Sequence, residues 1–241
     1  MSDVSVAVMT LILRVERGAP PQRTDALEAA AAASIAALRT TEASGDAFGS
    51  GLMARWQAAP RKIVRRARGL IWQQAVELAD ARLVVGSAEI LGFNVIESSD
   101  TPDLIRSMQV SGLELDDLGE PRELIEGSPI IWLNPHVTMT TGKAMAQAGH
   151  GATLAWECAS EAARSEWLLS GLRMRVRTAR IQLWPSVSEQ GPLVTDGGYT
   201  EVTPGSVTAA VALPDGFALS GGHEHRELEL AHASGENVGV H

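Results

Sequence analysis

A lysine, a glutamine and a histidine stand at positions 143, 147 and 150 of this sequence. Residues three or four apart share one face of a helix, so Lys143, Gln147 and His150 fall on one stripe. Residues 140–143 are typical of a helix start, with a threonine placed to cap the first turn. A lysine can stabilise a developing negative charge and a histidine can accept a proton. An ordinary solvated helix face explains the stripe at least as well.

The opposite side of the same helix is apolar and mostly small: Met145, Ala148, Gly149, Ala152, Ala155 and Trp156. Small residues allow a helix to lie close to its neighbour, and we expect this side to cover a sheet. The stripe of Lys143, Gln147 and His150 then faces away from that sheet.

A second group of polar residues lies at 194–208 and reads V-T-D-G-G-Y-T-E-V-T-P-G-S-V-T. Asp196 followed by two glycines is a strong turn signal, and making that turn is the ordinary role for the aspartate. Thr200 and Thr208 follow it. If the turn and the helix stripe meet, their side chains form one cleft with Lys143 and His150.

An internal repeat appears when the chain is compared with itself at one fixed shift, which sets Arg61 against Arg173. Over positions 61–95 ten pairs are identical, where about two are expected from composition. The pairs are Arg61/Arg173, Val64/Val176, Arg65/Arg177, Ala67/Ala179, Arg68/Arg180, Trp72/Trp184, Glu77/Glu189, Gly86/Gly198, Glu89/Glu201 and Val95/Val207. The repeat predicts a strand, a helix, a basic strand and a strand pair in each copy, at 6–15, 24–38, 62–68 and 83–96, then at 130–133, 142–159, 174–179 and 193–212.

The same shift sets polar residues of the second copy against apolar residues of the first. It pairs Asp196 with Val84, Thr200 with Ala88 and Thr208 with Ile96. We therefore expect one site, in the second copy. The predicted fold class is α/β: two fused copies of a small mixed β-sheet with flanking helices, arranged as a pseudo-dimer. Expected domains are a degenerate repeat at 1–100, an acidic linker at 101–127, a complete domain at 128–213 and a polar tail at 214–241.

Composition limits the class of protein. The chain has 241 residues, 45% of them hydrophobic, and a formal net charge of −9, which argues against indiscriminate binding of nucleic acid. Its one cysteine, Cys158, permits no intrachain disulfide and suits a cytoplasmic location. The apolar stretch 4–13 is too short to span a bilayer, so it predicts a buried strand. His223 and His225 in the polar tail are a weak metal signal, and we expect no metal.

Taken together, these residues resemble a known family. T-G-K-A-M-A-Q-A-G-H-G-A at 141–152, D-G-G-Y-T at 196–200 and P-G-S at 204–206 are similar, in residues and spacing, to motifs of the type-two peptidyl-tRNA hydrolases. The likeness covers residues 128–213. Three positions depart from the family pattern: Thr141 and Tyr199 stand where the family usually has basic residues, and Ala148 where many members have cysteine.

The resemblance implies hydrolysis of the ester that joins a peptide to tRNA, without a cofactor. It implies a catalytic set of Lys143, His150, Asp196 and Thr200, with Lys143 stabilising the oxyanion and either Asp196 or His150 acting as base. Gln147 and Thr208 would be positioning hydrogen bonders.

Arg173 and Arg175 lie in a local cluster of arginines, which makes them the candidates for contact with tRNA; solvated ends of an edge strand are the ordinary alternative. Since relatives of this kind are usually homodimers, the fused copy predicts a monomer that contains its own dimer. Two other functions stay open: a non-catalytic tRNA- or ribosome-associated protein, and an esterase or amidase that acts on another carrier.

Overall fold

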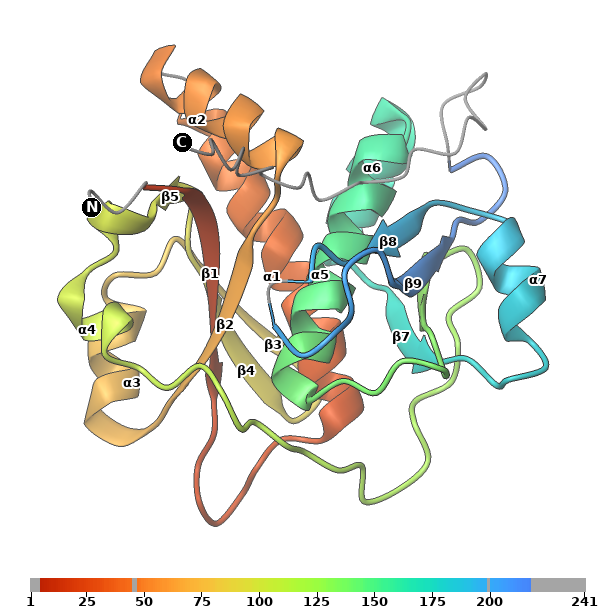
Figure 1. The fold of residues 1–241 in the computed structure, drawn as a ribbon, viewed down its shortest axis with the longest axis horizontal. Helices are drawn as coiled ribbons and strands as arrows, with labels where there is room; N and C mark the ends of the chain where they lie inside the picture. Colours follow the sequence, from red (N-terminus) through yellow and green to blue (C-terminus); the bar gives the residue numbers. More distant parts are fainter. Residues whose placement is uncertain (1–4, 45–46, 199, 218–241) are drawn as a thin grey trace, which may run out of the picture.

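The computed structural model describes residues 5–44, 47–198 and 200–217, and it contains two mixed β-sheets with helices around them (Figure 1). The first sheet has the order β2-β1-β4-β3, formed by β1 (Ala7–Arg14), β2 (Lys62–Ala67), β3 (Ala81–Val85) and β4 (Ala88–Gly92), with β5 (Ile96–Glu97) also paired to β1. The second has the order β7-β6-β9-β8, formed by β6 (Ile130–Leu133), β7 (Arg175–Thr178), β8 (Leu193–Thr195) and β9 (Val207–Ala212). The predicted α/β class with two small mixed sheets is confirmed.

The two sheets share one topology. In the first sheet, β1 runs parallel to β2 and antiparallel to β4, and β4 pairs with β3. In the second, β6 runs parallel to β7 and antiparallel to β9, and β9 pairs with β8. The register agrees as well, because Leu11 pairs with Val64 where Ile131 pairs with Val176. The internal repeat seen in the sequence is therefore a repeat of strand order and pairing.

Two long helices lie between the sheets and pack along each other (Figure 1): α1 (Arg23–Ala43) and α5 (Thr141–Cys158). Each is followed by a further helix, α2 (Ala47–Ala58) or α6 (Glu161–Leu169). Shorter helices lie on the outer sides, with α3 (Gly69–Val76) and α4 (Asp103–Arg106) beside the first sheet and α7 (Trp184–Glu189) beside the second. A 3₁₀ turn, η1 (Ser98–Asp100), precedes α4. The sequence predicted α1 and α5 but none of the others.

The small residues of α5 serve the contact between helices. A Cβ on Gly149 would collide with Ser34 Oγ of α1, so glycine is required for this close approach. Gly149 faces both α1 and Lys62 of β2, while Gly151 packs against Ile131 of β6. The stripe of Lys143, Gln147 and His150 was expected to face away from a sheet, and this expectation is wrong. Gln147 and His150 are buried, and Gln147 accepts a hydrogen bond from Thr208 of β9. One hydrophobic core contains residues of both halves, including Leu11 and Ala148. This shared core argues against independent domains joined by a flexible linker.

Matching tryptophans anchor the two halves. Trp56 Nε1 donates to the Arg61 carbonyl at 3.1 Å, and Trp167 Nε1 donates to the Arg173 carbonyl at 2.7 Å. Arg61 and Arg173 are an identical pair of the repeat, so both halves fix the helix before the basic strand in the same way. Both tryptophans are buried in the core.

The spacing of the repeat changes after the basic strand of each half. Val64 of β2 corresponds to Val176 of β7, at the same shift that pairs Arg61 with Arg173. In the last strands, Leu13 pairs with Ile90 where Leu133 pairs with Ala209, so Ile90 corresponds to Ala209 at a larger shift. The longer connection before β9, at 196–206, accounts for the difference.

Six residue assignments of the repeat are therefore wrong. Glu89, rather than Ile96, corresponds to Thr208 by the strand ladder, and Ile96 belongs to β5. Since Leu83 pairs with Ile90 where Val194 pairs with Ala209, the position of Asp196 is matched by Val85. The affected pairs are Ile96/Thr208, Val84/Asp196, Gly86/Gly198, Ala88/Thr200, Glu89/Glu201 and Val95/Val207.

The acidic segment 101–127 is held against both halves. Ile105, Met108, Leu113 and Leu115 are buried, and the Leu115 amide donates to Thr141 Oγ1 at 3.0 Å.

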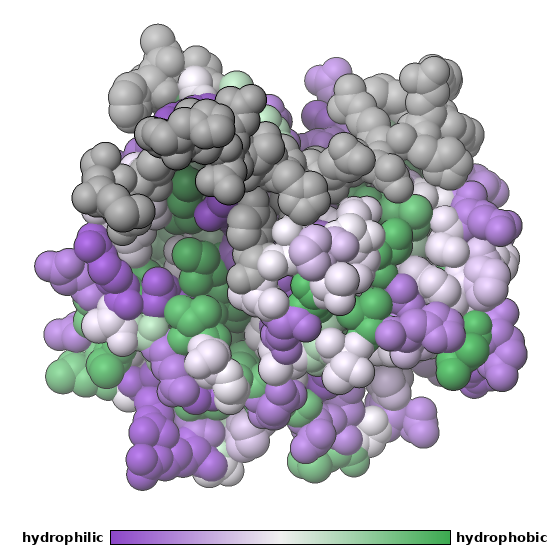
Figure 2. All heavy atoms as spheres, viewed as in Figure 1, coloured by the Kyte–Doolittle hydropathy of each residue, from purple (hydrophilic) through white to green (hydrophobic). Residues whose placement is uncertain are grey.

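No described helix is long and apolar enough to cross a membrane. Figure 2 shows hydrophilic side chains around the rim of one face and hydrophobic ones in separate groups, an ordinary surface for a folded protein. Most of the predicted polar tail, residues 218–241, lies outside the described residues.

Candidate active site

The first turn of α5 is fixed by a cap that itself has a partner. Thr140 accepts a hydrogen bond from the Lys143 amide at 3.3 Å, as the sequence predicted for a threonine at this position. The Thr140 hydroxyl donates to Glu201 at 2.7 Å, and its amide donates to the same carboxylate at 3.1 Å. Glu201 therefore ties the helix start to the connection between β8 and β9.

Lys143 and Asp196 meet at this helix start. Lys143 Nζ lies 2.5 Å from Asp196 Oδ2, and Gln147 Nε2 donates to the same oxygen at 2.7 Å. Thr208 Oγ1 donates to Gln147 Oε1 at 2.7 Å, so the chain of contacts continues into β9. Asp196, Gln147 and Thr208 are buried, whereas the Lys143 side chain keeps 12% of its surface exposed. Within this buried network, Lys143 is the group that reaches solvent.

The loop from Asp196 to Ser206 holds the carboxylate in place. The Gly198 amide donates to Asp196 Oδ1 at 2.7 Å, so both carboxylate oxygens are engaged. Gly198 has φ +74°, and a Cβ there would collide with Pro204, which explains the glycine. Backbone bonds from Asp196 N to Ser206 O at 2.9 Å and from Gly205 N to Asp196 O at 2.8 Å close the loop. Asp196 thus makes the turn and also faces Lys143.

His150 lies on the predicted stripe but belongs to a different contact. Its position is seven residues beyond Lys143, a rise of about 10 Å along the helix. Its Nδ1 lies 3.3 Å from Nζ of Lys62, a residue of β2 in the first half. Burial, with the nearby charges of Lys62 and Lys143, lowers the pKa of His150 well below its usual value, so the ring is neutral at pH 7.

Thr200 is exposed, and within the described part of the chain no hydrogen bond joins it to Lys143, Asp196 or His150. The structure therefore brings together Lys143, Asp196, Gln147 and Thr208, with His150 further along the helix. The single cleft expected for Lys143, His150, Asp196 and Thr200 is shown for Lys143 and Asp196 only.

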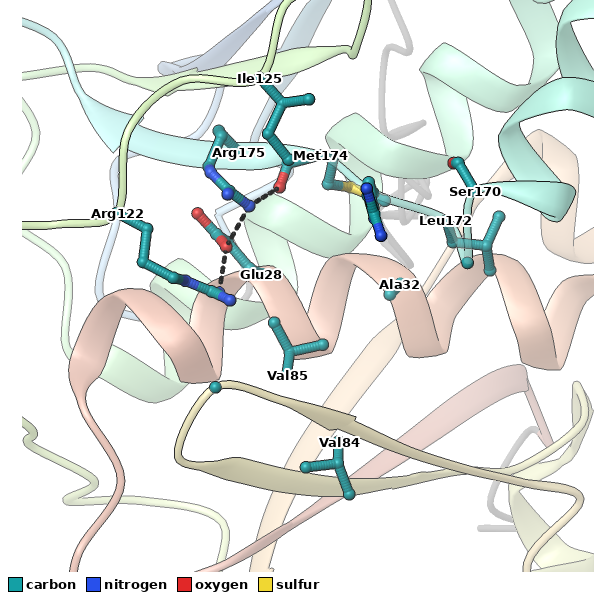
Figure 3. Close-up of a pocket in the computed structure, with 13 residues that line it drawn as sticks. Glu28, Ala32, Val84, Val85, Arg122, Ile125, Ser170, Leu172, Met174 and Arg175 are labelled. Carbon is teal, nitrogen blue, oxygen red and sulfur yellow. Dashed lines mark hydrogen bonds and ion pairs between the residues drawn. The ribbon is translucent and has the colours of Figure 1, made fainter.

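The two candidate arginines differ in their surroundings. Arg173 is exposed, and its guanidinium has no ion-pair partner among the described residues. Arg175 is largely buried and pairs with Glu28 of α1 at 3.1 Å (Figure 3). Glu28 also pairs with Arg122 at 2.6 Å and Arg177 at 2.8 Å, so one buried carboxylate holds three guanidinium groups. Arg175 is thus committed to an ion pair within the protein.

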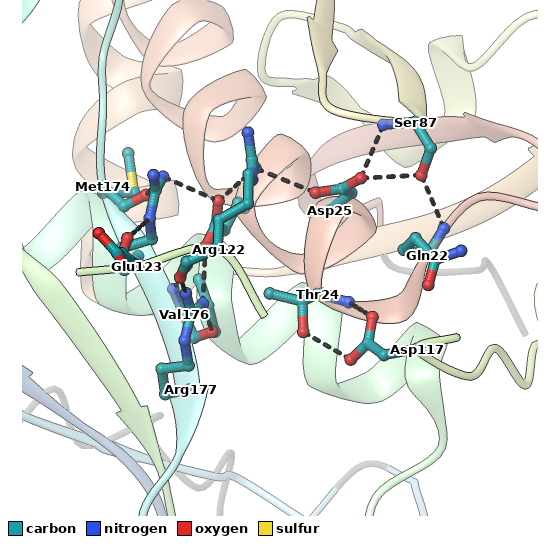
Figure 4. Close-up of polar contacts among 12 residues, drawn as sticks. Gln22, Thr24, Asp25, Ser87, Asp117, Arg122, Glu123, Met174, Val176 and Arg177 are labelled. Atoms are coloured by element: carbon teal, nitrogen blue, oxygen red, sulfur yellow. Dashed lines mark hydrogen bonds and ion pairs between the residues drawn. The ribbon is translucent and has the colours of Figure 1, made fainter. Parts of the chain in front are cut away.

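The corresponding helix start in the first half carries opposite charge. Asp25 of α1 accepts hydrogen bonds from the Ser87 amide at 2.7 Å and hydroxyl at 2.8 Å, in the turn between β3 and β4 (Figure 4). Arg122 pairs with Asp25 at 3.0 Å. The first half therefore places a carboxylate on its helix and a serine in its turn, where the second half places a lysine on its helix and a carboxylate after the strand.

Sequence reasoning missed Lys62 and Glu28, two charged residues of the first half whose side chains contact the second half. The signal for Lys62 was present, because the fixed shift of the repeat sets this lysine against Met174. Glu28 had no comparable signal, because the ten identical pairs of the repeat all lie beyond residue 60. Among the described residues, no group of three or more His, Cys, Asp or Glu could hold a metal ion; His223 and His225 lie outside them.

Comparison of the chain with models of known protein families finds no match, and comparison with curated proteins finds none either.

Proposed function

We propose that this protein hydrolyses the ester bond between peptide and tRNA in peptidyl-tRNA, at a site formed by Lys143 and Asp196. The observation that supports the proposal is the contact of Lys143 Nζ with Asp196 Oδ2 at 2.5 Å. These are two of the residues that the resemblance to type-two peptidyl-tRNA hydrolases assigns to catalysis. Although far apart in the chain, they meet at the exposed end of an otherwise buried polar network.

The proposed reaction uses water as the nucleophile. Asp196 takes a proton from water as its oxygen attacks the ester carbon, and Lys143 Nζ stabilises the oxyanion of the tetrahedral intermediate. Collapse of the intermediate breaks the bond to the ribose oxygen, which leaves with the proton that Asp196 took from water. Asp196 is the better candidate base, because it shares the site of Lys143, whereas His150 lies two helical turns away.

Gln147 and Thr208 support the carboxylate from behind. Thr208 donates to Gln147 Oε1 and Gln147 donates to Asp196, so the amide orientation is set by a hydroxyl that is itself fully buried. Such a chain fixes a carboxylate within the narrow range of positions that catalysis requires. We assign both residues a positioning role.

One observation favours a second candidate, an esterase acting on another carrier. Arg175 and Arg177 are both paired with Glu28, which leaves fewer free cations for the phosphates of tRNA than the sequence suggested. Arg173 remains exposed and is the proposed contact to tRNA.

We also propose that the chain acts as a monomer in which α1 covers the surface of α5 that a second subunit would otherwise bury. The shared core and the matching strand order support this pseudo-dimer. Light scattering is expected to give the mass of one chain. A mass of two chains would contradict it.

The proposed function is tested by incubating the protein with an N-acetylated aminoacyl-tRNA, the same aminoacyl-tRNA with a free amine, and a small carboxylic ester. Release from the blocked tRNA alone is the expected result. Cleavage of the small ester alone would favour the other esterase. Binding of tRNA without release from any substrate would mark a non-catalytic protein of the same fold.

A further inference from the structure

Lys62 belongs to β2 of the first half, but its side chain ends against α5 of the second. Its Nζ donates to Thr153 Oγ1 at 3.0 Å and lies 3.3 Å from His150 Nδ1. The aliphatic part passes close over Gly149, where a Cβ would stand 3.0 Å from Lys62 Cδ. The ammonium also lies 4.6 Å from the centre of the Trp56 ring. Glycine in α5 and tryptophan in α2 together make the passage for this lysine.

Packing does not explain a lysine at this place. The strand register matches Lys62 with Met174, which is buried in the corresponding position of the other half. Methionine has similar length and fills such a gap without the cost of taking an amine out of water. Of these two equivalent positions, the lysine occupies the one that faces α5, the helix of the candidate active site.

We infer that Lys62 is a positioning residue that the first half contributes to the site of the second half, by donating to Nδ1 of His150. A ring that accepts at Nδ1 carries its proton on Nε2, so the contact selects one tautomer of the neutral imidazole. The ammonium also disfavours a second proton on the ring, because two like charges would then lie side by side. For its part in turnover this inference rests on the proposed function, whereas the state of the ring does not.

The charged groups around this pair are few. The negative charge of Glu157, on α5, favours the protonated form of Lys62. The positive charges of Lys62 and of Lys143, which lies on the same helix as His150, disfavour the protonated form of the ring. Burial lowers the pKa of Lys62 to about 7, against a smaller opposing effect of Glu157. Near neutral pH the lysine therefore changes charge, and its repulsion on the ring changes with it.

The test follows the His150 ring by NMR of histidine ring nitrogens in the full chain, with His150→Asn identifying its signals. Lys62→Met, which copies Met174, is the main variant; Lys62→Arg keeps a donor and a charge; Arg39→Met removes an exposed cation of α1 as the matched control. In the parent we expect one neutral tautomer, protonated at Nε2, and a titration well below pH 6.5. In Lys62→Met the titration is expected to rise by about one pH unit and the single tautomer to be lost.

Lys62→Arg and Arg39→Met are expected to keep the parent ring signals, and Lys62→Arg shows that a change is not due to unfolding. An unchanged titration and tautomer in Lys62→Met would overturn the inference, whatever the activity. The role in turnover is read from kcat with N-acetylated aminoacyl-tRNA, which is expected to fall in Lys62→Met and to be kept in Lys62→Arg. If the ring changes in Lys62→Met and kcat does not, the role in turnover is refuted. If the parent releases nothing while the ring changes as expected, the proposed function fails and the ring assignment stands.

Discussion

The starts of α1 and α5 are the most informative pair of regions in this protein. Both helices begin at the same point of equivalent sheets. In both, a side chain of the first turns contacts the connection between two strands, β3 and β4 for α1 and β8 and β9 for α5. In α5 a cation, Lys143, holds an anion that follows β8. In α1 an anion, Asp25, holds the amide and hydroxyl of Ser87.

The first half also sends two charged side chains, of opposite sign, into the second. Lys62 of β2 reaches α5, and Glu28 of α1 reaches Arg175 and Arg177 of β7. The first contact places a single cation beside a neutral histidine, whereas the second neutralises arginines. One contact between the halves therefore lies on the helix of the candidate site, and the other holds the two halves together by ion pairs.

Glu28→Gln is the strongest test of this division. Removing one partner of a buried ion network leaves unpaired charges, so we expect the free energy of unfolding in urea to fall by about 3–5 kcal/mol. Gln147→Ala, in the early part of α5, removes two hydrogen bonds but no charge and is expected to cost about 1–2 kcal/mol. Equal losses for the two variants would break the comparison.

Lys143→Ala tests whether the start of α5, rather than that of α1, carries the activity. Because a preorganised charge acts mainly on the transition state, turnover of N-acetylated aminoacyl-tRNA is expected to fall by roughly 10²- to 10³-fold with the fold intact. Asp25→Asn alters the matching turn of α1 and is expected to leave turnover unchanged. Loss of activity in Asp25→Asn, or full activity in Lys143→Ala, would show that the halves do not divide the work in this way.

Titration of Lys62 should make the stability of the protein depend on pH, an effect that a methionine at this position would remove. Its folded pKa of about 7 lies below its ordinary 10.5, so between these values the unfolded chain holds a proton that the folded chain has released. Stability therefore rises with pH across this window, as far as Lys62 is concerned. Across the same window we expect Tm to increase more steeply in the parent than in Lys62→Met. Parallel curves would show that Lys62 titrates normally.

The smallest expected effect concerns Arg173 and Arg175. Arg173→Ala is expected to lower the salt slope of tRNA affinity by roughly 0.7–0.9 without changing stability, because one phosphate contact is lost. Arg175→Ala is expected to weaken stability instead, because it leaves Glu28 with one guanidinium fewer. The reverse assignment of the two effects would place the free cation at Arg175.

The sequence predicted the parts of the site that depend on local spacing. Helical periodicity put Lys143 and Gln147 on one stripe, the threonine before them marked the cap, and the glycines after Asp196 marked a tight turn. Identities between the halves predicted two equivalent sheets, because buried strands and anchoring tryptophans tolerate few substitutions. These features depend on residues close in the chain or on matched residues of the two copies.

Only the tertiary structure decided which residues share the site. The fixed shift of the repeat assigned wrong partners beyond the basic strands. The connection before β9 is longer in the second half, and a comparison at one fixed shift does not allow for an insertion. It could not show that Lys62 ends beside His150, or that Glu28 takes Arg175 away from solvent, since both contacts cross between the halves. The sequence by itself determined the helix stripe, the turn and the duplication. The packing of α1 on α5 decided which charges meet, because the effect of a charge depends on its neighbours in space, and here those neighbours come from opposite halves of the chain.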